Sequence, residues 1–152
     1  MISPETLRRF PLFSGLDPGM LKKLAMISEE VAFKTGEWFF HEGDEAESLF
    51  LILRGMIDLR IVVSDENEHR NDLTTLVEGE VMGWSALVEP HIYRLSAIAI
   101  ADTHVIRMDG IRLRELMEEN PEVGYRLMSR LAGSIGTRLN NMRVRLISLT
   151  EA

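Results

Sequence analysis

The stretch Lys34–Leu59, KTGEWFFHEGDEAESLFLILRGMIDL, decides the fold that we expect for this chain. Gly36, Gly43 and Gly55 divide it, and glycine marks tight turns because it reaches positive φ angles that other residues avoid. Between the last two glycines lies Ser48–Leu53, in which only the first residue is polar. Short apolar runs between glycine turns, without a helical period, predict half-buried strands of an antiparallel β structure.

The composition predicts one globular domain. The chain has 152 residues, of which 45% are apolar, and this is enough to bury a core. It has no cysteine, which excludes disulfides, thiolate catalysis and cysteine-ligated zinc. Neither a bilayer-spanning apolar run nor an N-terminal signal core is present, so we expect a cytoplasmic protein without a membrane partner.

Charge is unevenly distributed along the chain. The net charge is −7, and residues 123–152 hold five arginines against one acidic residue, which leaves −11 on residues 1–122. An acidic body argues against a surface that binds nucleic acid. We therefore expect the basic C-terminal segment to dock on the body or to stay solvated, rather than to form a nucleic-acid or membrane patch.

The glycine-rich stretch also contains a spaced motif, G-E-x-x-x-x-E-G-D followed after seven residues by I-x-x-G. Its members are Gly36, Glu37, Glu42, Gly43, Asp44, Ile52 and Gly55. From about Leu12 onward the chain resembles cyclic-nucleotide-binding domains, in particular the sensor half of the catabolite-activator and fumarate/nitrate-reduction regulators. The resemblance implies a mainly β fold, an antiparallel, jelly-roll-like β-roll with N-terminal helices (residues 1–120). A long dimerisation helix follows (residues 121–152).

Local signals place the other elements. Residues 4–10 predict a short helix, and Asp17 caps a second helix that starts at Pro18. Val31 and Phe33 begin the first strand. We expect later strands at 56–63, 73–77, 95–100 and 104–108, with an exposed polar loop at 64–71. A helix at 111–119 is capped by Asp109 and ended by Asn120-Pro121.

The segment Val81–Pro90, VMGWSALVEP, is the most informative for function. In the family this position is the phosphate-binding cassette, F-G-E-x-A-L, a short loop, and then Arg-Ser/Thr-Ala. The resemblance implies that the glycine opens a one-turn helix facing the cyclic phosphate, that the Glu binds the ribose 2′-hydroxyl, and that the Arg pairs with the phosphate. Gly83, Ala86 and Leu87 match the motif, so we expect the cassette helix to form.

Two positions depart from the cassette pattern. Trp84 stands where the family has Glu, and an indole has one donor and no acceptor, so it either stacks on a planar ligand or fills the pocket. Without a gap, Tyr93 falls on the family's Arg and Arg94 comes one place late. A one-residue slip turns a strand side chain to the other face, which makes Arg94 an exposed strand residue unless a bulge restores it. The candidate ligand-binding residues are Gly83, Trp84, Ser85, Ala86, Tyr93, Arg94 and Leu95.

The last predicted helix, 121–149, carries a heptad pattern. Its a/d seam consists of Met128, Ala132, Ile135, Leu139, Met142, Leu146 and Leu149. In the family this helix pairs with its twin in a parallel dimer; the alternative is an amphipathic helix lying on its own roll. We favour the homodimer, because the seam continues past Arg138 and extends beyond the roll.

Other residues of this helix are candidates for further roles. Gly133 and Gly136 permit close packing or a hinge. Arg138, Asn140 and Asn141 are candidates for capping the ligand.

Two functions remain open. One is a sensor that binds cAMP, cGMP or another small anion and signals through the helix to a downstream protein; the other is a ligand-free docking module whose pocket Trp84 fills. No helix-turn-helix domain follows the helix in this sequence. If the sequence is the whole protein, we expect no direct DNA binding; the alternative is a truncated sensor domain. We expect no enzyme and no metal site, because no catalytic motif stands out and the histidines, at positions 41, 69, 91 and 104, lack ligand spacing.

Overall fold

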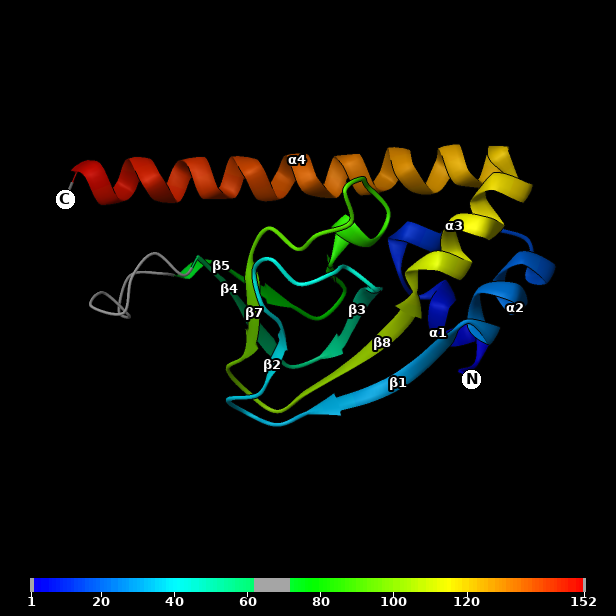
Figure 1. The fold of residues 1–152 in the computed structure, drawn as a ribbon, viewed down its shortest axis with the longest axis horizontal. Coiled ribbons are helices and arrows are strands. Elements are labelled where there is room, and N and C mark those ends of the chain that lie inside the picture. Colours follow the sequence, from blue (N-terminus) through cyan, green and yellow to red (C-terminus); the bar gives the residue numbers. More distant parts are fainter. Residues whose placement is uncertain (1, 62–71, 152) are drawn as a thin grey trace.

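The computed structural model describes residues 2–61 and 72–151 and shows the expected β-roll with flanking helices (Figure 1). The strands are β1 (Ser28–Phe33), β2 (Trp38–Phe40), β3 (Ser48–Arg54), β4 (Met56–Arg60), β5 (Asp72–Val77), β6 (Val81–Met82), β7 (Ser96–Ala99) and β8 (Thr103–Asp109). They form two four-stranded sheets, β1-β8-β3-β6 and β2-β7-β4-β5, in which every paired neighbour is antiparallel.

Strands β5, β7 and β8 differ from the expected bounds by a single residue at one or both ends, and two strands differ further. The first strand begins at Ser28, before Val31, because β1 pairs with β8 without interruption from Ser28–Met108 to Phe33–Thr103. The strand expected over 56–63 is β4 as far as Arg60. Its last two residues, the predicted loop 64–71 and His69 lie outside the described residues.

Strand β3 is buried on both faces, and the expectation of a half-buried strand was wrong for it. Leu49 and Leu51 pack into a core shared with the helices, whereas Phe50 and Ile52 pack into the core between the two sheets. All four are at most 4% exposed. The uninterrupted apolar run of this strand is typical of a strand covered on both faces.

The helices are α1 (Pro4–Arg8), the 3₁₀ turn η1 (Pro11–Phe13), α2 (Pro18–Met26), α3 (Gly110–Glu119) and α4 (Pro121–Glu151). Both predicted caps form: Asp17 Oδ1 accepts the Met20 N–H at 2.8 Å, and Asp109 Oδ1 accepts the Arg112 N–H at 3.0 Å. The first helix ends at Arg8 rather than at residue 10.

The motif glycines shape the roll. Gly36, Gly43 and Gly55 have φ angles of +92°, +94° and +113°. At Gly55 a Cβ would also lie only 2.6 Å from the Cα of Thr103, so the two segments could not approach with any other residue there. The requirement for glycine is therefore both conformational and steric.

Helix α4 lies along one side of the molecule as a single long rod (Figure 1). Its first half packs beside α3 and η1, and Leu127 and Leu131 belong to the helical core. Arg126 donates to the Gly15 carbonyl at 3.2 Å, and Arg130 to the Leu12 carbonyl at 3.1 Å. The basic segment therefore docks on the body here, through backbone carbonyls.

Candidate ligand-binding site

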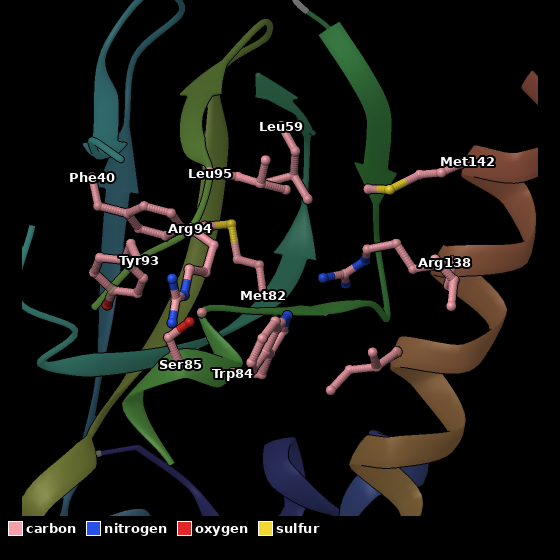
Figure 2. A pocket seen from close by; sticks show the side chains of 13 residues that line it. Phe40, Leu59, Met82, Trp84, Ser85, Tyr93, Arg94, Leu95, Arg138 and Met142 are labelled. Atoms are coloured by element: carbon pink, nitrogen blue, oxygen red, sulfur yellow. The ribbon is translucent and has the colours of Figure 1, made fainter. Parts of the chain in front are cut away.

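A cavity of about 200 Å³ lies where the cassette, the segment before β7 and helix α4 meet (Figure 2). Most of its wall is apolar. The cassette contributes Met82, Gly83, Trp84 and Ser85; the segment before β7 contributes Tyr93, Arg94 and Leu95; α4 contributes Ile135, Arg138, Leu139 and Met142; the roll adds Phe40 and Leu59. The two arginines are the charged residues among these, and no carboxylate lines the cavity in the described part of the chain.

The cassette forms the one-turn 3₁₀ helix η3 (Trp84–Ala86). Gly83 opens it with a φ of +82°, and a Cβ at this position would lie 2.8 Å from the Ser48 carbonyl oxygen. The Ala86 N–H donates back to the Gly83 carbonyl at 3.0 Å. From α3, Arg114 donates to the Ala86 carbonyl at 2.7 Å, so a neighbouring helix holds the end of the turn. Ala86, a predicted ligand-binding residue, is fully buried and does not line the cavity.

The motif turn positions the segment that follows the cassette. The Gly43 N–H donates to the Tyr93 carbonyl, and the Tyr93 N–H donates to the Asp44 carbonyl, both at 2.9 Å. Residues 94–95 then bend before β7 begins at Ser96. Because Arg94 lies in this bend rather than in a strand, strand alternation does not decide its orientation.

Tyr93 occupies the core. It is 5% exposed and stacks on Phe40 with ring centroids 3.7 Å apart. Its hydroxyl donates to the Ser48 carbonyl at 2.7 Å and accepts the Ser48 N–H at 3.2 Å. Burial raises the pKa of Tyr93 to about 12, and the backbone hydrogen bond with Ser48 opposes this rise. Tyr93 thus stabilises the fold beside the cavity and presents only part of its ring to it.

Arg94 and Leu95 both line the cavity. Figure 2 shows the Arg94 guanidinium beside the Ser85 hydroxyl. The side chain is largely exposed, and no described residue gives it a hydrogen bond or an ion pair. An unpaired cation therefore faces an otherwise mostly apolar space.

Trp84 forms one wall of the cavity and does not fill it. The side chain is half-buried and packs against the helical core, with its indole ring between Ser85 and α4 (Figure 2). The cavity remains open beside it, which goes against the alternative in which Trp84 plugs the pocket.

Among the predicted capping residues, only Arg138 reaches this cavity. Its guanidinium donates to the Val81 carbonyl, and burial lowers its pKa from the usual value. Asn141 lines a neighbouring groove instead. Asn140 lines neither the cavity nor this groove, because it lies on the face of α4 turned away from the roll. Gly133 has no atom within 4 Å of an added Cβ, and neither has Gly136, so close packing within this chain does not explain them.

The predicted seam divides between two environments. Met128, Ile135 and Met142 are partly buried against the body. Ala132 is exposed, and Leu139, Leu146 and Leu149 are 61%, 62% and 67% exposed. Sequence reasoning did not assign Ile135, Leu139 and Met142 to the cavity, although their heptad spacing had marked them. It also missed Phe40, Leu59 and Met82, which no local signal distinguishes from ordinary core residues.

Each of the three histidines among the described residues contacts a neighbouring residue. His91 Nδ1 donates to the Ser85 carbonyl at 3.0 Å, the His41 ring packs at a tilt against Trp38, and His104 contacts Arg54. No group of three potential metal ligands occurs among residues 2–61 and 72–151. Within the same residues, no helix is both long and apolar enough to span a bilayer.

Comparisons with known proteins agree with this geometry. A sequence model of the cyclic nucleotide-binding domain matches residues 30–120. A structure from Geobacter metallireducens, assigned as a cyclic nucleotide-binding protein, is 37% identical, with a TM-score of 0.82 over 91% of this chain and 99% of its own.

Two curated relatives are longer regulators. The CRP-like cAMP-activated global transcriptional regulator of Mycobacterium tuberculosis is 27% identical over 91% of this chain and 61% of its own length. The cyclic AMP receptor protein of Thermus thermophilus is 25% identical over 93% of this chain and 64% of its own. The chain spans about three fifths of each of these relatives. By the match over residues 30–120, this chain belongs to the cyclic nucleotide-binding domain family.

Proposed function

We propose that this chain is a regulatory sensor domain, which binds a small anionic ligand in the cavity and transmits its presence to helix α4. The observation that carries the proposal is the composition of the wall: Ile135, Arg138, Leu139 and Met142 of α4 face the same space as the cassette. A ligand in this space contacts α4 directly. Cyclic nucleotides are the first ligands to test, because the curated relatives are named for cAMP.

The charge of the cavity favours an anion. Arg94 faces it without a partner among the described residues, and a guanidinium forms strong, charge-assisted hydrogen bonds with phosphate or carboxylate oxygens. Ser85 lies beside the guanidinium and offers a hydroxyl (Figure 2). We therefore expect the anionic group of the ligand to lie between Arg94 and Ser85.

Arg138 connects the cavity to the position of helix α4. Its guanidinium holds α4 to β6 through the Val81 carbonyl while its side chain lines the cavity. A ligand that fills the cavity contacts the Arg138 side chain and its neighbours Ile135 and Met142 on α4, so the bound and unbound states favour different poses of α4. The ligand shifts their populations by its difference in affinity for the two poses.

The exposed part of α4 supplies an output surface. Leu139, Leu146 and Leu149 are mostly exposed, and full burial of a leucine side chain contributes about 1.5–3 kcal/mol. We propose that a second copy of the chain covers them in a homodimer and that a downstream protein responds to the dimer geometry. The ligand-free docking module is less favoured, because the cavity is open.

Calorimetric titration combined with hydrogen exchange tests this proposal. We expect cAMP, cGMP or phenyl phosphate to bind and to change exchange in residues 135–142 of α4. Arg94→Gln should weaken binding at least tenfold, because a hydrogen bond to a charged group contributes about 1.5–3 kcal/mol. The matched control is Arg112→Gln, an exposed arginine on α3 away from the cavity, which should leave affinity unchanged. If none of the three anions binds, or if the Arg94→Gln variant binds with unchanged affinity, the proposal of an anion sensor is refuted.

A further inference from the structure

We infer that this cavity selects a compact aromatic anion with few hydroxyl groups, rather than a sugar-containing one. The inference rests on the proposed function and names the chemical class of its ligand. It follows from three properties of the cavity: the hydrogen-bonding capacity of the wall, the volume, and the position of the unpaired charge.

The wall offers donors and almost no side-chain acceptors. Arg94, Arg138 and the indole of Trp84 only donate hydrogen bonds. The Tyr93 hydroxyl is already bonded to both backbone groups of Ser48, at 2.7 and 3.2 Å. The Ser85 hydroxyl is then the one free side-chain oxygen among the described lining residues. A ligand hydroxyl buried here would find only the Ser85 oxygen as a side-chain acceptor, and a buried hydroxyl whose proton lacks an acceptor weakens binding.

The volume fits a single ring with an anionic substituent. The cavity measures about 200 Å³. An apolar protein cavity of about 150 Å³ holds benzene, whereas pockets for drug-sized ligands range from about 300 to 1,000 Å³. The cavity therefore encloses a single ring with its anionic substituent, whereas a base, a ribose and a phosphate together extend beyond it.

The two arginines differ in availability. Arg138 is engaged with the Val81 carbonyl, whereas Arg94 has no partner among the described residues and lies next to Ser85. The anionic group therefore belongs at the Arg94 end. The aromatic ring of the ligand then lies against the indole of Trp84, because Met82 and Trp84 form the cavity wall between the two arginines (Figure 2). Aromatic rings stack favourably on indole, and the methionine sulfur adapts to their edges.

A matched pair of phosphate monoesters tests the inference by calorimetry. Phenyl phosphate and ribose 5-phosphate carry the same anionic group on an aromatic ring or on a sugar. We expect phenyl phosphate to bind at least tenfold more tightly than ribose 5-phosphate and cAMP, and phenol to bind at least tenfold more weakly than phenyl phosphate. Arg94→Gln should abolish the advantage of phenyl phosphate over phenol, and Arg112→Gln should preserve it.

A variant of the wall gives a second measurement. Trp84→Glu replaces the stacking surface by an acceptor and a negative charge, so it should reduce the ratio of phenyl phosphate to ribose 5-phosphate affinity at least tenfold. Circular dichroism checks that the variant is folded. Binding of cAMP or ribose 5-phosphate as tight as that of phenyl phosphate would overturn the inference and leave the anion sensor intact. Absence of binding by every one of these compounds would overturn both.

Discussion

Tyr93 should make the stability of the roll depend on pH above about 10. Its hydroxyl is buried against Ser48, and burial raises the pKa of Tyr93 from 10.0 to about 12. Below pH 10 the folded and unfolded chains both keep the proton. Between pH 10 and 12 the unfolded chain loses it while the folded chain retains it, so the free energy of unfolding falls as pH rises.

The size of the effect follows from the two pKa values. A rise of the pKa from 10.0 to about 12 corresponds to a total loss of about 2.7 kcal/mol above pH 12. At pH 11 about half of this loss, about 1.4 kcal/mol, has developed. Tyr93→Phe lacks the titrating group, but it leaves the Ser48 N–H and carbonyl without their partner, which costs about 1–3 kcal/mol at every pH.

Urea unfolding at pH 8 and pH 11, followed by circular dichroism, measures the effect. Other groups titrate over this range in both proteins, so the informative quantity is the difference in unfolding free energy between wild type and Tyr93→Phe. That difference should shrink by about 1.4 kcal/mol between pH 8 and pH 11. Tyr125→Phe is the control, because Tyr125 is 77% exposed, and its difference should stay constant. An unchanged Tyr93→Phe difference at pH 11 would show that the hydroxyl is not held in the core as described.

Two further predictions concern the cassette and α4. Gly83→Ala should lower the free energy of unfolding by about 2–4 kcal/mol, from left-handed strain and contact with the Ser48 carbonyl. Gly79→Ala, which has positive φ but open space, should lower it by only about 1–2 kcal/mol; equal losses in urea unfolding would contradict the steric argument. Leu139→Glu should convert a dimer at micromolar concentration to a monomer in sedimentation equilibrium, whereas the neighbouring Asn140→Glu should not. A Leu139→Glu chain of unchanged mass would argue against the seam.

The turns and helix caps could be predicted from local chemistry, and the β-roll followed from the family resemblance that the turn motif carries. The three motif glycines adopt positive φ as expected, and Asp17 and Asp109 cap their helices. Such features depend on one residue and its near neighbours. They can be identified without knowledge of the rest of the fold.

The orientation of Arg94 could not be predicted in this way. Counting along a strand assumes strict alternation, but residues 94–95 bend, and the preceding Tyr93 is fixed by hydrogen bonds to Gly43 and Asp44, about fifty positions earlier in the chain. The stack of Tyr93 on Phe40 adds another long-range contact. Which side chain faces the cavity is thus decided by tertiary contacts that no local pattern encodes.

The heptad pattern of α4 was ambiguous for a different reason. The face toward the body contains Leu127, Leu131, Ile135, Arg138 and Met142, with steps of four, four, three and four residues. The seam alternates steps of four and three residues, and the two sets share Ile135 and Met142. A helix that packs on its own roll and one that pairs with a partner therefore produce overlapping patterns, and only the exposed leucines beyond the shared positions distinguish them.

This overlap bears directly on signalling. Ile135, Leu139 and Met142 belong both to the cavity wall and to the predicted seam. A ligand that displaces these side chains changes the surface available to a partner, and a partner that orders them changes the cavity. Linkage requires the two effects to be equal: the factor by which ligand alters the affinity for the partner is the factor by which the partner alters the affinity for ligand. The sensor that we propose needs no separate relay, because the residues expected to contact the ligand are also the residues expected to contact the partner.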